Sequence, residues 1–307
     1  MAWDPEHIPS QDGKTFVVTG GNAGIGYFVA EQLAAAGGHV VITSRTQRRA
    51  DAALAAIRSQ VPGAQVDAVS LDLSSYASVR AATVQLEKLP RIDALIENAG
   101  SIMATKGRAE TEDGNELMFG TNHLGHFLLT ALLYPTLQKT AGSRIVTMGS
   151  SATKLRGFDL DDLQSEKGRY SAFGTYAQSK HATQSFGFEL DRRLRAAGSS
   201  VTALVAHPGS AQDGASPERP GVFEPSAGDR LKARLLFFFG GGKDRAAWSV
   251  VRAATDPDAR GGEYWGPRGA FSGPPVTQTP PAQSHGAGAG ASLWRASEEL
   301  VGQRFPI

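Results

Sequence analysis

The stretch Thr19-Gly-Gly-Asn-Ala-Gly-Ile-Gly26 decides the fold of this 307-residue chain. It follows a short β-branched run at 15–19 and precedes an apolar pattern of helical period at 25–36, so it predicts a strand, a tight turn and a helix. Glycine lets a backbone approach a ligand closely, and the free N–H groups of a helix N-terminus attract a pyrophosphate. Because the spacing is not G-x-G-x-x-G, a plain tight turn is the alternative interpretation.

Outward from this turn, short apolar runs alternate with helical patterns as far as residue 206. The expected strands are 15–19, 40–43, 66–71, 94–97, 145–148 and 201–205, with 261–266 as a further candidate. The expected helical patterns are 25–36, 52–57, 79–89, 117–137 and 186–194. This alternation predicts an α/β fold, namely a doubly wound (Rossmann) parallel sheet with helices on both faces.

Two later segments interrupt the alternation. Residues 207–245 are rich in Pro, Gly and Ala before they become apolar, and they predict a mobile loop that leads into a helix. Residues 266–292 predict a surface-wrapping or partly disordered segment, followed by a short helix at 293–300. No linker divides the chain, so we expect a single domain over 1–307. Its core spans about 13–265, a substrate lid about 210–245, and a Gly/Pro/Ala-rich C-terminal segment about 266–307.

Composition excludes several classes of function. The formal net charge of +1 provides no global field for nucleic acid or acidic membranes. The absence of cysteine excludes disulfides, thiolate metal sites and a cysteine nucleophile, and it is compatible with a reducing cytoplasm. The longest apolar cluster, 235–239, is too short for a membrane span, and the first residues lack a signal-peptide pattern. We therefore expect a cytoplasmic protein without nucleic-acid partners.

Tyr176 and Lys180 are four residues apart in Thr175-Tyr-Ala-Gln-Ser-Lys180, a spacing that places both on one face of a helix. Beside a dinucleotide, this pair predicts carbonyl–alcohol redox chemistry with Tyr176 as general acid. A neighbouring ammonium should lower the pKa of the phenol. The alternative is a tyrosine that only packs; nearby Tyr170 has no lysine four residues further on.

The residues after the second expected strand, Ile42-Thr-Ser-Arg45, indicate which dinucleotide binds. NAD sites usually carry an acid here, and this chain has none. Arg45 can grip a 2′-phosphate with its planar fork, and Ser44 can add a hydrogen bond. The sequence therefore favours NADPH or NADP⁺ over NAD. The alternative is that Arg45, Arg48 and Arg49 form only a solvated first helical turn.

In these motifs the chain resembles the short-chain dehydrogenase/reductase family, most closely its retinol-dehydrogenase-like and protochlorophyllide-reductase-like branch. The resemblance covers about residues 13–210. It rests on motifs in family order: the 19–26 turn, Leu71-Asp-Leu73, Asn98-Ala-Gly100, Gly120-Thr-Asn-His-Leu-Gly-His126, residues 144–151, Tyr176-Ala-Gln-Ser-Lys180 and His207-Pro-Gly209.

The resemblance implies a role for each matching position. Asn122, Ser150, Tyr176 and Lys180 would form the catalytic tetrad, with Ser151 as the fallback for Ser150. Asp72 would bind the adenine, Asn98 would stabilise the central strand, and Pro208-Gly209 would support the nicotinamide. The cofactor-binding set is then Gly20, Asn22, Gly24, Ile25, Gly26, Ser44, Arg45, Asp72, Leu73, Asn98, Ala99, Gly100, Tyr176, Lys180, Pro208 and Gly209. His123 and His126 are three apart, but no third ligand follows, and we expect no metal.

Two positions depart from the family pattern. Glu97 stands where the family usually has Asn, and a buried carboxylate there needs partners or a raised pKa. Asp213 stands near the position of a Thr that contacts the nicotinamide amide, and it could accept from that amide instead.

The sequence as a whole predicts an NADPH-dependent carbonyl (ketone or aldehyde) reductase, a ketoreductase. A medium-sized, largely apolar substrate is inferred from residues 235–239 and Phe271 near the expected lid. One alternative is an NADP-dependent alcohol dehydrogenase, and another is a non-catalytic NADPH-binding scaffold or sensor. A homo-oligomer is possible, because family members often pair through the helices that carry Asn122 and Tyr176.

Overall fold

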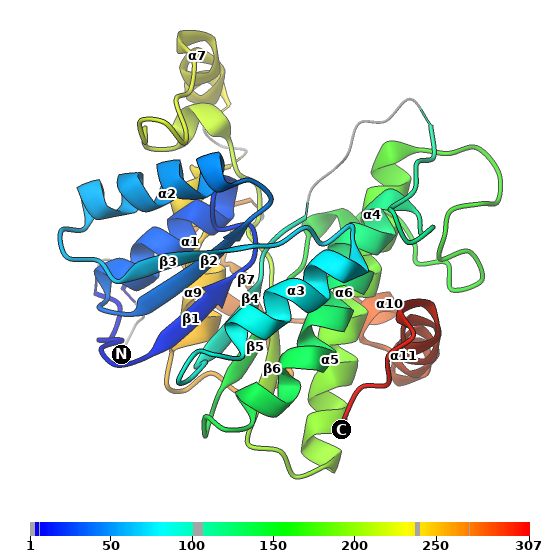
Figure 1. Ribbon diagram of the computed structural model, residues 1–307. Helices are drawn as coiled ribbons and strands as arrows, with labels where there is room; N and C mark the ends of the chain where they lie inside the picture. The colour runs from blue at the N-terminus through cyan, green and yellow to red at the C-terminus, as the bar shows by residue number, and fades with distance from the viewer. Residues whose placement is uncertain (1–3, 6, 101–106, 237–239, 270) are drawn as a thin grey trace.

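The computed structural model of the protein describes residues 4–5, 7–100, 107–236, 240–269 and 271–307. A mostly parallel eight-stranded sheet forms its centre, in the order β3-β2-β1-β4-β5-β6-β7-β8 (Figure 1). Only the β7–β8 pair is antiparallel. The strands are β1 (Thr15–Val18), β2 (His39–Ser44), β3 (Val66–Ser70), β4 (Ala94–Glu97), β5 (Arg144–Met148), β6 (Thr202–Ala206), β7 (Tyr264–Pro267) and β8 (Pro275–Gln278).

Helices cover both faces of the sheet, as predicted. One face carries α1 (Gly24–Ala35), α2 (Gln47–Gln60) and α9 (Trp248–Thr255). The other carries α3 (Tyr76–Leu86), α5 (Gly125–Leu137) and α6 (Ala172–Ala196). Serine side chains begin two of these helices: Ser75 accepts from the N–H of Ser78 in α3, and Ser171 accepts from that of Gly174 in α6.

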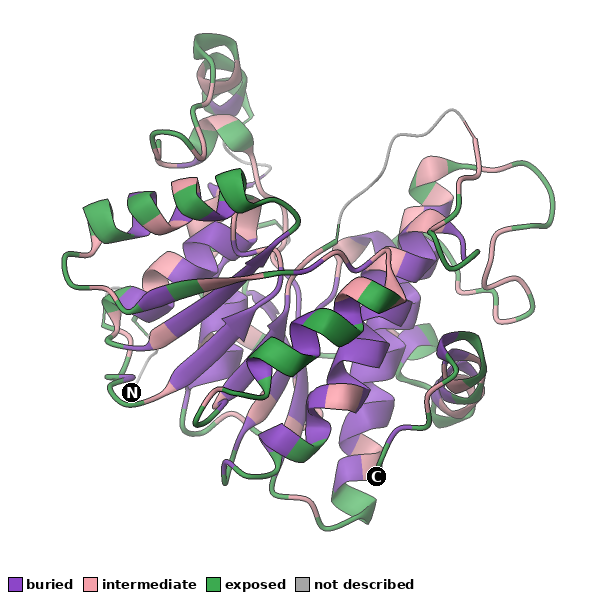
Figure 2. Cartoon of the chain, viewed as in Figure 1, coloured by how far each residue is buried: buried purple, intermediate pink, exposed green. Residues whose placement is uncertain are grey.

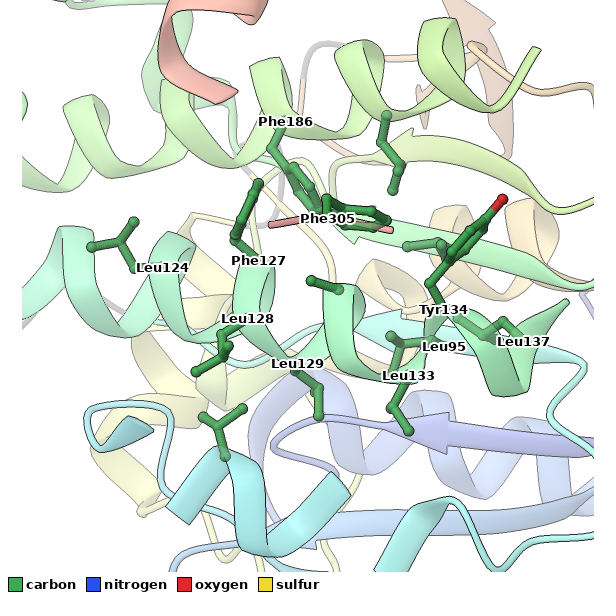
Figure 3. Close-up of a cluster of buried hydrophobic side chains, with 14 of the residues drawn as sticks. Leu95, Leu124, Phe127, Leu128, Leu129, Leu133, Tyr134, Leu137, Phe186 and Phe305 are labelled. Atoms are coloured by element: carbon green, nitrogen blue, oxygen red, sulfur yellow. The ribbon is translucent and has the colours of Figure 1, made fainter. Parts of the chain in front are cut away.

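Alternation along the strands divides the core in two. Val17 of β1 packs with the α3/α5/α6 layer, whereas its neighbours Phe16 and Val18 pack with the α1/α2/α9 layer. Figure 2 shows the sheet and the inner helix faces as buried. The α5/α6 side holds a dense aromatic and leucine cluster that includes Phe127 and Phe186 (Figure 3). This parallel sheet, buried on both faces, confirms the predicted fold class.

The C-terminal segment is more regular than its composition suggests. Its described residues form β8, α10 (Ala282–His285) and α11 (Ala287–Val301). The interpretation of 266–292 as partly disordered is therefore wrong, and the final helix begins at 287 instead of 293. Alanine favours helix, and Gly290 lets α11 approach α6, since a Cβ there would lie 2.7 Å from Arg192 Nη2.

Side chains of the C-terminal segment complete the α5/α6 core. Trp294 and Phe305 are 3% and 6% exposed, with ring centroids 4.8 Å apart. Each also packs edge-to-face against Phe127, with ring centroids 5.3 and 5.7 Å apart. Figure 3 shows Phe305 among Phe127, Tyr134 and Phe186. Full burial of a phenylalanine side chain stabilises a fold by roughly 1.5–3 kcal/mol, so this tail belongs to the core.

The expected lid contains η3 (Asp213–Ala215), α7 (Ala227–Leu235) and the start of α8 (Lys243–Ala246), so the predicted helix is confirmed. Arg219 ties this segment to α1 through two hydrogen bonds of 2.6 Å to the carboxylate of Glu31. A capping box between Ser226 and Asp229 begins α7, which projects from the sheet in Figure 1. The predicted apolar cluster falls partly on 237–239, which lie outside the described residues.

Candidate active site

A cleft of about 860 Å³ opens beside β1, β2, β4 and β5, at the carboxyl ends of these strands. In parallel α/β sheets ligands bind at this edge, where the strand order reverses. Here the reversal lies between β1 and β4. The predicted residues that line the cleft are Gly20, Asn22, Gly24, Ile25, Ser44, Arg45, Asp72, Leu73, Asn98, Ala99, Gly100, Tyr176, Lys180 and Pro208.

The glycine turn joins β1 to α1 along one wall of the cleft. Gly24 has a φ of +60°, which favours glycine, and it begins α1. Gly26 does not line the cleft; a Cβ there would lie 2.2 Å from Asn98 Nδ2 and 2.7 Å from the Gly20 carbonyl oxygen. No side chain of the described residues caps the first turn of α1. Its N–H groups are thus available to an anion in the cleft.

Three arginines form one end of the cleft, which we call the arginine end. Arg45, Arg48 and Arg49 are exposed, and they line the cleft around the start of α2. Ser44 is buried, and its hydroxyl already donates to the Thr46 carbonyl at 3.0 Å. The arginines, more than Ser44, are therefore the groups that can meet a phosphate there.

Asp72 follows β3 and Asn98 follows β4, and both line the cleft. Asp72 accepts hydrogen bonds from the backbone and the hydroxyl of Ser74, at 2.9 and 2.7 Å. The amide of Asn98 donates to the Thr19 carbonyl at 2.9 Å, which joins the end of β4 to the glycine turn. The backbone of Ala99 donates to the Thr19 hydroxyl at 2.9 Å. Asn98 thus holds the central strands together, as the resemblance implies.

Tyr176 and Lys180 form the other end, which we call the tyrosine end. Both side chains project from α6 into the cleft. The Tyr176 hydroxyl donates to Ser150 Oγ at 3.4 Å, so Ser150, and not Ser151, is the serine that faces it. Tyr170, the possible rival, donates instead to Glu116 at 3.3 Å.

Burial dominates the electrostatics of the tyrosine end. It raises the pKa of Tyr176 above its ordinary value, and the hydrogen bond with Ser150 partly opposes this rise. The pKa of Tyr176 was predicted to fall beside Lys180, but it rises in this structure. Lys180 Nζ donates to the Met148 carbonyl at 2.9 Å. Burial lowers the pKa of Lys180 itself to about 8.

Asn122 lies behind this pair in η1 (Gly120–Leu124), a π-helical turn between α4 (Leu117–Phe119) and α5. Such turns are frequent at functional sites because they shift a side chain or carbonyl out of the regular ladder. The side-chain amide of Asn122 donates to Ser179 Oγ at 3.0 Å, and the backbone carbonyl of Asn122 accepts from the Thr183 hydroxyl at 3.2 Å. Asn122 is buried, and it does not line the cleft.

The two histidines beside Asn122 bind neighbouring protein groups. His123 Nε2 is 2.8 Å from Ser297 Oγ of α11. His126 lies 3.0 Å from the Asn122 carbonyl and 2.9 Å from the Thr19 hydroxyl. Burial lowers their pKa values to about 3 and about 4, so both are neutral at pH 7.

Several predicted residues stand outside the lining of the cleft. These are Gly26, Asn122, Ser150 and Gly209. Asp213 is also absent from the lining, and its carboxylate forms an ion pair with Lys243 at 2.8 Å. Its contact with the nicotinamide amide stays a prediction. Residues missed by the sequence reading include Thr43, Thr121 and Met148. The sequence shows that these three residues lie in or beside the motifs, but it does not show that they line the cleft.

The residues that line the cleft fit a dinucleotide that carries an additional phosphate, such as NADP. The cleft connects an exposed cationic end, an open helix N-terminus, the half-buried Tyr176 and the buried Lys180 in one space. A phosphate could lie at the first, a pyrophosphate at the second and the reacting ring at the third.

Comparisons with known proteins agree with this geometry. A family model described as short chain dehydrogenase matches residues 14–216. Human retinol dehydrogenase 13 is 42% identical over 201 residues, which cover 65% of this chain and 60% of that protein. The chain thus spans about three-fifths of that relative's length. Mouse polyprenol dehydrogenase is 37% identical over 263 residues, which cover 84% of this chain and 76% of that protein.

Solved structures show the same architecture. The crystal structure of an uncharacterized protein from Mycobacterium paratuberculosis aligns over 100% of both chains, with a TM-score of 0.80 and 36% identity. A short chain dehydrogenase from Burkholderia cenocepacia in complex with NADP aligns over 83% of this chain and 96% of its own, with a TM-score of 0.61 and 25% identity. The chain therefore belongs to the short-chain dehydrogenase family, within its retinol-dehydrogenase-like branch.

Proposed function

We propose that this protein is an NADPH-dependent reductase of ketones or aldehydes, with Tyr176 as the general acid. The observation that carries the proposal is the joining of the arginine end and the tyrosine end in one cleft. The first end suits a 2′-phosphate, and the second suits the protonation of a nascent alkoxide. Bound NADPH would supply the hydride.

The arginine end supports NADPH over NADH. Arg45, Arg48 and Arg49 offer planar donor forks, and the described part of the chain gives none of them an ion-pair partner. The first turn of α2 contains no acidic residue that would repel a phosphate. The relative from Burkholderia cenocepacia was crystallised with NADP, which agrees with this preference.

The tyrosine end supports reduction. Because burial raises the pKa of Tyr176, the phenol stays protonated at neutral pH and can donate its proton. Ser150 would hold the carbonyl oxygen beside it as part of an oxyanion site. Lys180 would hold the ribose hydroxyls and keep cofactor and acid in register, and Asn122 would hold a water behind Lys180 that returns a proton to the pair.

A direct experiment follows NADPH consumption with a panel of medium-sized apolar ketones and aldehydes, for the wild type and for Tyr176→Phe. Loss of the hydroxyl should reduce turnover at least ~10²-fold while NADPH still binds. Tyr170→Phe is the matched control, because that hydroxyl bonds Glu116. Turnover in Tyr176→Phe equal to the wild type would remove Tyr176 from the mechanism.

A second candidate is NADP⁺-dependent oxidation of an apolar alcohol. Relatives named retinol dehydrogenase and polyprenol dehydrogenase favour it. Oxidation needs the phenolate, so its rate should rise with pH, whereas reduction uses the phenol, whose pKa is raised above its ordinary value, and should change little below pH 10. Rates in both directions from pH 6 to 10 distinguish the two candidates.

An apolar substrate is suggested by exposed side chains of the lid and of the β7–β8 connection. Leu235 and Phe271 are 73% and 44% exposed. No helix in the described residues is long and apolar enough to cross a membrane. The cytoplasmic location stays a prediction.

The oligomeric state is also a proposal. α11 lies against α5 and α6, so pairing through these two helices would have to displace it. Any homo-oligomer would therefore use another surface, and light scattering on the intact chain tests this.

A further inference from the structure

Glu97 is a carboxylic acid inside the core, and the proposed mechanism has so far given it no role. It ends β4, and its side chain is 1% exposed. Because Leu95 packs with the α5/α6 layer, alternation turns Glu97 toward the same layer, which is also the layer of Lys180. A charge in such a place is retained only where hydrogen bonds and an opposite charge compensate its lost hydration.

Two threonines provide the hydrogen bonds. Thr130 of α5 donates to Oε1 at 2.5 Å, and Thr147 of β5 donates to Oε2 at 2.8 Å. Both carboxylate oxygens therefore accept a hydrogen bond from a hydroxyl, an arrangement that suits the ionised acid.

The strand β5, which carries Thr147, also binds Lys180 of α6 through its next residue. Its Nζ donates to the carbonyl of Met148, which directly follows Thr147 in β5. One strand thus anchors the carboxylate through a side chain and the ammonium through a backbone group. The two charges affect each other: Lys180 lowers the pKa of Glu97, and Glu97 raises that of Lys180.

The other titratable groups around Lys180 cannot take this role. His126 of α5 is neutral at pH 7, since burial lowers its pKa to about 4. Tyr176, from the same helix as Lys180, is a neutral phenol at this pH. Among the described residues, Glu97 is the acid whose charge acts on Lys180.

We propose that Glu97 is a positioning residue for the proposed reaction: its carboxylate, set behind Lys180 in the core, keeps that ammonium protonated and directed into the cleft. The proposal rests on the proposed function. It assigns a purpose to the departure from the family pattern at position 97, namely an inner counter-charge that offsets the burial of Lys180. Without it, Lys180 would lose its proton at a lower pH.

The direct test is a titration of Lys180. Carbon-13 labelling at lysine Cε, with the Lys180 resonance assigned from Lys180→Met, reports the ionisation of this side chain in the intact protein. Burial raises the pKa of Glu97 to about 7, so the wild-type Lys180 resonance should show a second inflection near that pH. In Glu97→Gln this inflection should vanish, and the main titration should move down by roughly one pH unit.

NADPH binding provides a second readout. Fluorescence titrations from pH 6 to 9.5 should give Glu97→Gln an affinity within about twofold of wild type at pH 6, with the alkaline loss of binding moved down by roughly the same unit. Glu97→Asn, which restores the usual family residue, should behave like Glu97→Gln. Asp191→Asn is the matched control, a buried acid further along α6 that pairs with Arg195, and it should leave both titrations unchanged.

The result that overturns the proposal is a Lys180 titration that is single in the wild type, or unchanged in the position-97 variants. An affinity loss that is equal at every pH would also overturn it, because it would indicate a structural role only. These readouts need no substrate. Failure of the wild type to reduce any carbonyl would thus reject the proposed function and leave the proposal on Glu97 to be judged by the titrations.

Discussion

The arginine end of the cleft lies in solvent, whereas the tyrosine end lies against the core. Arg45, Arg48 and Arg49 are exposed, while Lys180 is 2% exposed. At the first end, charges meet a ligand through water and are screened by salt. At the second, burial shifts pKa values and makes each polar contact costly to lose. The comparison teaches that one cleft can combine exposed charge, which suits the proposed selection of the cofactor, with buried charge, which suits the proposed chemistry.

The largest effect should come from the buried end. In Lys180→Met an apolar side chain of similar length replaces the ammonium, so the proposed contact with the ribose and the hydrogen bond to the Met148 carbonyl are both lost. Turnover should fall at least ~10²-fold at its optimum pH, measured by NADPH consumption. Lys154→Met, at an exposed lysine after β5, is the control and should stay within about twofold. Equal losses in both variants would contradict the distinction between the two ends.

A smaller and more selective effect should come from Arg45→Ala. Loss of a charge-assisted hydrogen bond to the 2′-phosphate costs about 1.5–3 kcal/mol, so Kd for NADPH should rise roughly 10- to 100-fold. Kd for NADH should stay nearly constant, because NADH lacks that phosphate. Arg80→Ala on α3 removes the same charge from the other layer of helices and should change neither constant. Parallel weakening of both cofactors in Arg45→Ala would mean that the arginine end does not select between them.

The smallest effect should be that of salt. Raising the ionic strength from about 0.05 to 0.5 M shortens the Debye length, so Kd for NADPH should rise several-fold in the wild type and less in Arg45→Ala. The rate at saturating NADPH should change little, since Lys180 is buried and Tyr176 is half-buried. Kd can be followed by NADPH fluorescence at each salt concentration. A salt-dependent rate with a constant Kd would reverse the assignment of the two ends.

Much of the site was predictable from sequence because its motifs follow strands directly. In a parallel sheet, carboxyl ends of strands meet at one edge, so the turn at 19–26, Asn98 and Ser150 had to be neighbours. The four-residue spacing of Tyr176 and Lys180 needed only a helix. These inferences use local geometry, which short sequence patterns describe well.

Contacts between distant segments were less predictable. The antiparallel β8 and the early start of α11 were missed because glycine, proline and alanine are also typical of irregular segments. The pKa of Tyr176 was predicted to fall and rises instead, since desolvation of the phenol outweighs the other effects on it. Asp213 forms an ion pair with Lys243, which lies thirty residues further along the chain, and no sequence spacing predicts this pair.

The sequence by itself determined the parallel sheet, the glycine turn beneath the cleft and the pairing of Tyr176 with Lys180, because these depend on period and on adjacency in the chain. Only the tertiary structure decided the π-helical turn at Asn122, the closure of the α5/α6 core by Trp294 and Phe305, and the enclosure of Glu97 between two threonines. The physical reason is that burial and its compensation depend on which distant side chains meet, and the free energy of a buried charge depends on all of them together.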